Sequence, residues 1–113
     1  MRKKDLIIRK VTARALNIPM IRPLMARHKF THWVAVIVDI ETEGEVRGRG
    51  YICPYLASGV AAHIRIIEML GEAYIGRTIA PNKMFDESMR SILTIGQNGV
   101  GLSALAAVDI ALW

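Results

Sequence analysis

The first half of the chain carries apolar and polar residues in the two-residue alternation that is typical of β-strands. Residues 10–15 alternate strictly between apolar and polar side chains. Residues 33–42 are rich in β-branched residues and alternate only in their second part, as in a strand with neighbours on both sides. The turn signal Glu43-Gly44-Glu45 joins this segment to a third strand over residues 46–53. The pattern predicts a three-stranded antiparallel meander.

A longer connection, residues 17–32, separates the first two predicted strands. It contains Pro19 and Pro23, which are incompatible with a regular helix or a central strand. We therefore expect an irregular loop at this place. Loops of this length in a compact domain are usually functional or mobile.

The second half of the chain carries apolar residues at helical spacing. Residues 60–74 form an amphipathic pattern that Ser58 can cap. Asn82 can cap a second helix, and the carboxylates of Asp86 and Glu87 would then complement its positive N-terminal end. The apolar stripe of this second helix consists of Phe85, Met89, Ile92 and Leu93.

Residues 102–113 form a third predicted helix. Apart from Ser103 and Asp109 this segment is apolar on every side, so we expect it to be enclosed. The glycine-rich residues 96–101 precede it and indicate a helix–helix connection rather than a phosphate-binding loop, because they follow a helix and no lysine comes after them. Together the patterns predict an α+β fold, a three-stranded antiparallel meander followed by a three-helix layer.

The size of the chain limits what it can do. Its 113 residues make one domain, too short for a catalytic barrel or a two-domain enzyme. The chain is 52% hydrophobic, and its mean hydropathy of +0.29 is high for a small independent domain. This composition indicates a domain that buries part of its surface against something else. The single cysteine, Cys53, excludes an intramolecular disulfide framework and a cysteine-rich zinc site.

The charge balance is basic, with 15 lysines and arginines against 10 acidic residues and a net charge of +5. One basic cluster is residues 2–4, and another lies between Arg22 and Lys29. Exposed aromatic residues among the charges, or a recognition helix, would indicate a nucleic-acid binder. The sequence shows neither, so we expect no nucleic-acid partner, and the second cluster fits an anionic small molecule.

No targeting or membrane signal is expected. No segment reaches the roughly 18 apolar residues that a membrane-spanning helix needs. The basic residues at the start are followed by apolar residues that Arg9 and Lys10 interrupt, which argues against a signal peptide. With no cysteine pairs, we expect a cytoplasmic location and no membrane partner.

Side chains that could carry chemistry have simpler interpretations. Asp39 and Glu41 alternate with apolar residues, as on the solvent face of a strand. His63 lies on the apolar side of its helix and is interpreted as a hydrogen-bonded packing residue. Cys53 is interpreted as a small core or loop residue, since no base can be paired with it. No three carboxylates have the spacing of Mg²⁺ ligands, so we expect no catalytic residue and no metal ligand in this chain.

Two motifs carry a resemblance to a known family. The glycine hairpin and third strand, residues 43–51, and the closing helix Ala107-Val108-Asp109-Ile110-Ala111-Leu112-Trp113 are similar to those of the enolase superfamily. The stretch from Tyr51 to Tyr55 and the segment from Pro19 to Leu24 resemble the mandelate racemase branch. The whole chain resembles the N-terminal capping domain of a mandelate racemase/muconate lactonizing enzyme-like protein, truncated before its barrel.

The resemblance implies a reaction that this chain alone cannot perform. Enzymes of this superfamily abstract the proton α to a carboxylate and stabilise the resulting enediolate on Mg²⁺. The catalytic groups and the metal ligands lie on the missing C-terminal barrel. The parent would be a homo-oligomeric racemase, epimerase or acid-sugar dehydratase that takes a small carboxylate substrate. The 113 residues would be catalytically inert and would serve substrate specificity.

By the same resemblance, two loops of the chain, residues 19–32 and 51–59, would close over the mouth of the barrel. Arg27, His28 and Lys29 replace residues that are mostly apolar in mandelate racemase, which implies a more polar or anionic substrate such as a sugar acid. One of the two loop tyrosines could instead pack between sheet and helices. The candidate substrate-binding residues are Tyr55, Tyr51, His28, Met25 and Phe30.

Two other hypotheses stay open from the residues alone. The chain could be a self-standing protein-interaction or small-molecule-binding module, with its apolar last helix as the partner surface. It would then be a stable species, whereas a truncated domain would expose apolar surface and associate; dye binding and sedimentation separate the two. A basic nucleic-acid binder is the third hypothesis, and absence of salt-dependent binding would exclude it.

Overall fold

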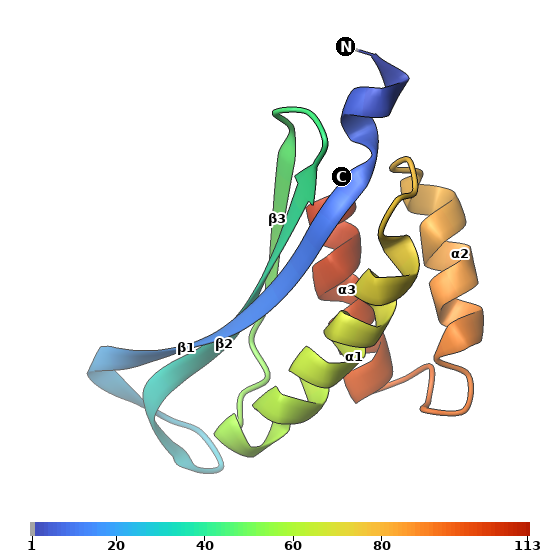
Figure 1. The fold of residues 1–113 in the computed structure, drawn as a ribbon. Helices are drawn as coiled ribbons and strands as arrows, with labels where there is room; N and C mark the ends of the chain where they lie inside the picture. Colours follow the sequence, from blue (N-terminus) through green and yellow to red (C-terminus); the bar gives the residue numbers. More distant parts are fainter. Residues whose placement is uncertain (1) are drawn as a thin grey trace.

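The three helices cover one face of a three-stranded sheet, and the other face carries no helix (Figure 1). The computed structural model describes residues 2–113. The elements are β1 (Ile8–Met25), β2 (Lys29–Thr42), β3 (Arg47–Ile52), α1 (Val60–Tyr74), α2 (Pro81–Ser91) and α3 (Val100–Leu112), with two short 3₁₀ turns at Lys3–Leu6 and Ala57–Gly59. The strands pair in the order β1-β2-β3, both pairs antiparallel. The predicted α+β fold, a meander followed by a three-helix layer, is confirmed.

The prediction of an irregular loop over residues 17–32 is wrong. β1 and β2 form one long hairpin that continues pairing beyond Pro19, which lies opposite His32, and closes with Met25 opposite Lys29. The prolines are tolerated because β1 is an edge strand, where a missing N–H on the outer side costs no ladder bond. The register shifts between Pro19 and Leu24, so Pro23 falls within the irregular part of the ladder.

Close packing of α3 on the sheet depends on two glycines of β3. A Cβ atom on Gly48 would lie 1.8 Å from the carbonyl oxygen of Ala111, and one on Gly50 would lie 2.1 Å from that of Ala107. The helix backbone therefore approaches the strand more closely than any side chain would allow. The glycines that carried part of the family resemblance serve the packing of α3.

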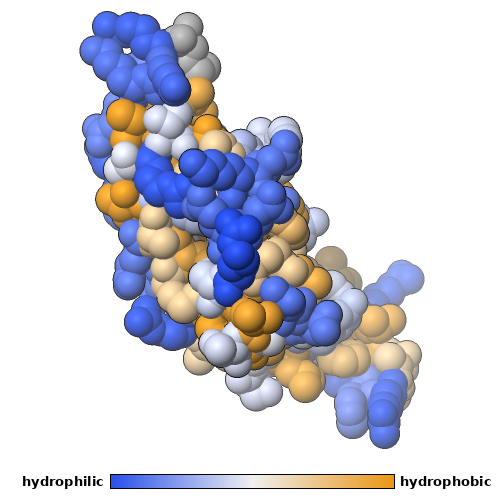
Figure 2. All heavy atoms as spheres, turned by 90° about the vertical axis from the view of Figure 1, so that its right-hand side faces the viewer, coloured by the Kyte–Doolittle hydropathy of each residue, from blue (hydrophilic) through white to orange (hydrophobic). Residues whose placement is uncertain are grey.

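The last helix is not enclosed on all sides by the described residues. Leu105 and Val108 are fully buried against the sheet and α1. In contrast, Ile110 is 51% exposed and Trp113 is 77% exposed. Figure 2, which looks onto the helical side, shows further apolar atoms among hydrophilic ones. The expectation that the chain buries part of its surface against another partner stays a prediction.

Both predicted helix caps are wrong by one or two positions. α1 begins after Gly59, with Ser58 inside the preceding 3₁₀ turn and no side-chain cap bond. α2 begins at Pro81, one residue before Asn82, because the fixed φ of proline suits the first helical position. α2 also ends at Ser91, so Leu93 lies beyond it and is 65% exposed.

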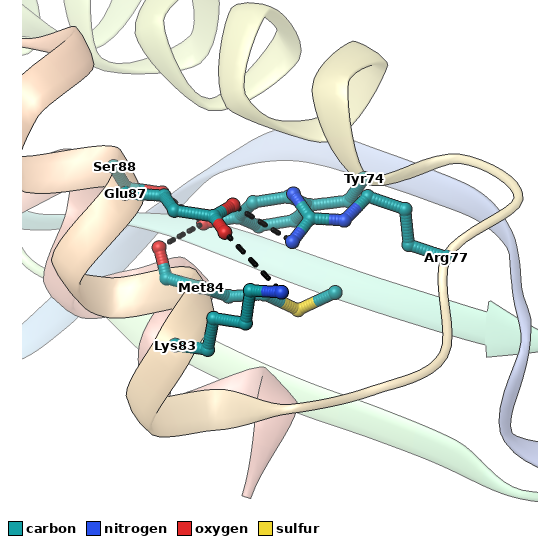
Figure 3. A network of polar contacts seen from close by, with 6 residues as sticks. All are labelled: Tyr74, Arg77, Lys83, Met84, Glu87 and Ser88. Atoms are coloured by element: carbon teal, nitrogen blue, oxygen red, sulfur yellow. Dashed lines mark hydrogen bonds and ion pairs between the residues drawn. The ribbon is translucent and has the colours of Figure 1, made fainter.

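A polar network ties the end of α1 to α2 (Figure 3). The Arg77 guanidinium lies 2.7 Å from the carboxylate of Glu87, which also lies 4.0 Å from the ammonium of Lys83. The buried Tyr74 hydroxyl hydrogen-bonds to the Ser88 hydroxyl. Glu87 therefore pairs with cations on both sides instead of serving chiefly the helix N-terminus. Burial raises the pKa of the Tyr74 hydroxyl, and the hydrogen bond from Ser88 opposes part of this rise.

The raised pKa of Tyr74 predicts a loss of stability in alkali. The native state holds the phenolic proton more tightly than the unfolded chain, whose tyrosine pKa is about 10. The stabilisation is complete below that value and is lost as the pH rises through the native pKa. We expect urea unfolding midpoints to fall more steeply above pH ~10 for the wild type than for Tyr74→Phe. Equal pH dependence of the two proteins would contradict this assignment.

Within residues 2–113, no helix is both long enough and apolar enough to cross a membrane.

Candidate functional site

A hollow of about 290 Å³ lies where β2 continues past the end of β3. β3 pairs only with Val36–Glu41 of β2, so the earlier half of β2 has no neighbour from β3 on that side. After β3 the chain turns away and returns alongside this bare part of β2. The hollow is lined by residues 28–32 and Val34 of the hairpin and by Tyr55, Leu56 and Ala57 of the returning chain, with Asn17 from β1.

Tyr55 is held in an unusual backbone conformation. Its φ of 62° lies in the left-handed region, which a tyrosine rarely adopts. The N–H of Leu56 donates to the carbonyl of Pro54 at 2.7 Å, which closes a three-residue turn centred on Tyr55. The Tyr55 ring meets the ring of Trp33 edge-on, with centroids 5.8 Å apart at 78°. Backbone strain of this kind clusters at ligand sites, where the surrounding packing holds it in place.

Trp33 also fixes the chain before this turn. Its indole N–H donates to the Cys53 sulfur at 2.9 Å. Cys53 is partly buried, which agrees with its interpretation as a small packing residue. The turn that presents Tyr55 is therefore anchored to β2 through two contacts of the Trp33 indole, the hydrogen bond to Cys53 and the ring contact with Tyr55.

The structure brings three of the five candidate residues together. His28, Phe30 and Tyr55 all line the hollow, although Tyr55 lies on a different segment from the other two. Met25 ends β1, is 70% exposed and does not line the hollow.

Tyr51 lies away from the hollow as well. Successive side chains of a strand point to opposite faces, and Gly50 faces α3. Tyr51 must therefore point to the face of the sheet without helices, where it lies opposite Ile37 and is 60% exposed. Tyr51 is thus neither in the hollow nor packed between sheet and helices.

Asn17 and His32 line the hollow but were not among the candidate residues. Both fall in the segment that was predicted to be an irregular loop. Continued pairing of the two strands places Asn17 opposite Val34 and His32 opposite Pro19. Extending the strand alternation through Pro19 would have been the signal that identifies them.

The hollow suits an anion. Its lining contains Lys29 and the imidazoles of His28 and His32, and it contains no carboxylate among the residues that the structure describes. The Thr31 hydroxyl and the His32 ring nitrogen Nδ1 lie 3.0 Å apart, which orients that imidazole. The Phe30 and Tyr55 rings supply apolar contact area beside these donors. The arrangement can bind and orient a carboxylate next to an apolar group.

Magnesium has no ligand cluster in the part of the chain that the structure describes. Residues 2–113 contain no group of three or more His, Cys, Asp and Glu side chains placed to hold a metal ion. Asp39 and Glu41 are engaged by guanidinium groups, with Arg49 at 2.6 Å and Arg9 at 2.7 Å. The ligand set that Mg²⁺ prefers is therefore not formed by this part of the molecule.

His63 has the structural role that its position predicts. Its side chain is 6% exposed, and Nδ1 lies 2.7 Å from the carbonyl oxygen of Gly59 at the start of α1. The imidazole therefore closes the first turn of its own helix, and its interpretation as a hydrogen-bonded packing residue is confirmed.

Solved structures share this fold closely. An enolase from the alphaproteobacterium bal199, with bound magnesium, is 30% identical with a TM-score of 0.89 over 95% of this chain and 30% of that one. An enolase from Bradyrhizobium, complexed with magnesium and mandelic acid, is 27% identical with a TM-score of 0.86 over 95% and 30%. A racemase from Streptomyces coelicolor A3(2), with bound magnesium, is 25% identical with a TM-score of 0.87 over 95% and 31%.

The chain thus spans about 30% of the length of these proteins. The comparison with curated proteins returns no match. The family model for the N-terminal domain of mandelate racemase and muconate lactonizing enzyme matches residues 8–113, nearly the whole chain. The expected resemblance is therefore confirmed, and the chain belongs to the family of mandelate racemase/muconate lactonizing enzyme N-terminal domains.

Proposed function

We propose that this chain is the substrate-capping domain of a magnesium-dependent enzyme that abstracts the proton α to a carboxylate. The metal and the acid–base groups would be supplied by a barrel domain outside the 113 residues, since residues 2–113 form no metal site. Two similar proteins support the reaction class, the Bradyrhizobium enolase complexed with magnesium and mandelic acid and the Streptomyces racemase with bound magnesium. The reaction would be a racemisation, an epimerisation or the dehydration of an acid sugar.

The observation that carries this proposal is the hollow between the hairpin tip and the Tyr55 turn. Two segments far apart in the sequence meet there and present His28, Phe30 and Tyr55 to one space. Placed over a barrel mouth, these side chains would exclude water from one side of the substrate. Exclusion of water strengthens each charge interaction inside the closed site, so a donor such as His28 would gain in selectivity for an anionic group.

The exposed residues at the end of α3 support the proposal that a barrel domain packs against this chain. Ile110 near the end of α3 is 51% exposed, and Trp113, the residue after this helix, is 77% exposed, although the backbone of α3 packs closely on β3. A barrel that follows α3 directly would cover this surface. We also propose a reducing, cytoplasmic compartment, with which the single cysteine of these 113 residues agrees.

The proposal is tested by joining this chain to a barrel. The chain replaces the matching domain of the alphaproteobacterial enolase, which is 30% identical to it. Exchange of the α-proton of hydroxy acids is followed by NMR in deuterium oxide. We expect magnesium-dependent exchange by the joined protein and none by the 113 residues alone. Exchange by the isolated chain would contradict the proposal.

The role of the hollow is tested by two matched variants of the joined protein. His28→Ala removes a donor that lines the hollow, and Met25→Ala removes an exposed side chain of the same hairpin outside it. We expect His28→Ala to raise KM by about tenfold with little change in kcat, because it removes binding that is equal in ground and transition states. Met25→Ala should change neither constant; equal effects of the two variants would contradict a role for the hollow.

A further inference from the structure

One face of the sheet is not covered by helices (Figure 1). The strand register places on it a set of side chains that the proposed function does not use. The strand register aligns them in three rows that run across β1, β2 and β3. Two rows are charged or polar, and the third contains an exposed tyrosine. The rows are Lys10–Glu41–Arg47, Thr12–Asp39–Arg49 and Arg14–Ile37–Tyr51.

Positive charge is in excess on this outer face. Asp39 receives two guanidinium groups, Arg49 at 2.6 Å and Arg14 at 3.9 Å. Glu41 receives Arg9 at 2.7 Å, and the hydrogen bond from this arginine, with smaller help from the charge of Arg47, lowers the pKa of the Glu41 carboxyl.

Among residues 2–113, Arg47 and Lys10 have no carboxylate within 4.0 Å. Together with Arg9, Arg14 and Arg49 they make five cations on this face against two carboxylates. Arg47 borders a hollow of about 310 Å³ that is also lined by Thr12, Arg49 and both carboxylates, Asp39 and Glu41. Arg49 and Arg9 already engage these two carboxylates. The Arg47 guanidinium could therefore donate hydrogen bonds to a carboxylate from another molecule.

Apolar surface adjoins the charged rows. The Tyr51 side chain is 60% exposed, and its neighbour Ile37 on β2 is half-buried. Tyrosine and arginine are the residue types most often found at the energetic centres of protein interfaces, where an apolar centre is surrounded by polar groups. The row of Tyr51 beside the rows of Arg47 and Arg49 has this composition.

The carboxylates of Asp39 and Glu41 indicate which class of partner the outer face can bind. Asp39 and Glu41 lie on β2, in the middle of the face, between cations on either side. A continuous phosphate backbone would meet their negative charge, whereas single carboxylates of a folded protein can pair with individual arginines at the rim. The pattern therefore favours an acidic protein surface over a nucleic acid.

We propose that the outer face of the sheet binds a carboxylate-bearing surface of another protein chain, with Tyr51 buried at its centre and Arg47 and Arg49 paired with the partner's carboxylates. The proposal assigns Tyr51 to an interface instead of the substrate. It is independent of the capping role, because the hollow with Tyr55 contains none of these residues.

The test uses the whole 113-residue chain and a fluorescein-labelled peptide of alternating glutamate and leucine. Binding is followed by fluorescence anisotropy. The variant Arg47→Gln/Arg49→Gln is compared with Arg65→Gln/Arg90→Gln, which removes the same charge from exposed positions on the helical side. We expect the first double variant to weaken binding by at least about tenfold and the control to change it less than about twofold. Tyr51→Ala should weaken binding by about fivefold or more.

Circular dichroism checks that each variant keeps the fold. Should the Arg49 change unfold the chain by releasing Asp39, Arg47→Gln alone carries the test, and we expect it to weaken binding by about fivefold. Equal weakening by the control pair, or no peptide binding below about 1 mM, would overturn the proposal. Tighter binding of duplex DNA, lost in the same variants, would overturn it in favour of a nucleic-acid surface.

Discussion

Replacing Gly48 by alanine is expected to destabilise the protein by about 3 kcal/mol, the upper end of the usual range for overpacking. The new Cβ atom would lie 1.8 Å from the carbonyl oxygen of Ala111. That oxygen belongs to the backbone of α3, which cannot move aside without shifting the helix off the sheet. The loss is measured by urea unfolding at neutral pH.

Gly59→Ala is the matched control. A Cβ atom at Gly59 would meet the His63 ring at 3.7 Å, an ordinary contact, and the Gly59 backbone is already helical. We expect the control to unfold within about 0.5 kcal/mol of the wild type. Unchanged stability of Gly48→Ala would show that α3 does not pack on β3 as described.

The second large effect is expected for Leu105→Ala. Leu105 is fully buried on the side of α3 that faces the core, so its truncation removes apolar contacts and leaves a cavity. Such changes cost about 2–5 kcal/mol. For a domain of this size, a loss of that order lowers the thermal midpoint by at least about 8 °C, which calorimetry would detect.

Leu102→Ala gives the comparison on the same helix. Leu102 is 37% exposed, so the chemically identical truncation removes less buried surface. We expect a loss below about 1 kcal/mol. Equal losses of unfolding free energy in the two variants would contradict the burial of Leu105 and the partial exposure of Leu102.

The helical half of the molecule could be predicted from sequence because its pattern is local. Residues 60–74 carry an uninterrupted amphipathic repeat, and the predicted helix has the observed bounds. The closing motif that ends at Trp113 likewise predicted a helix, and its alanines and apolar residues suit close packing on a sheet. These features depend only on neighbours one or two turns away.

The long hairpin could not be predicted because proline is disfavoured in a central strand but tolerated in an edge strand. Pro19 lies in β1, which is an edge strand of the sheet. The order of the strands cannot be predicted from the local pattern of residues. Because this strand pairing was not predicted, Asn17 and His32 were not identified as residues that line the hollow.

The positions of the two tyrosines follow from different physical causes. Tyr51 could have been assigned to the outer face, because Gly48 and Gly50 on alternate positions face α3. Tyr55 could not, since its direction depends on a turn with positive φ that Trp33 and Pro54 stabilise together. Long-range contacts of this kind leave no periodic signal.

In the proposed enzyme, the hollow would help to decide which carboxylate the barrel acts on. Its most direct test is the ratio of kcat/KM for a six-carbon sugar diacid over that for mandelate, measured in the joined protein and in the unmodified alphaproteobacterial enolase. The lining, with the ammonium of Lys29 and the imidazole of His28, predicts a shift of this ratio towards the diacid by at least about tenfold, reversed in part by His28→Ala. An unchanged ratio in a joined protein that folds and binds magnesium normally would contradict a role of the hollow in substrate selection.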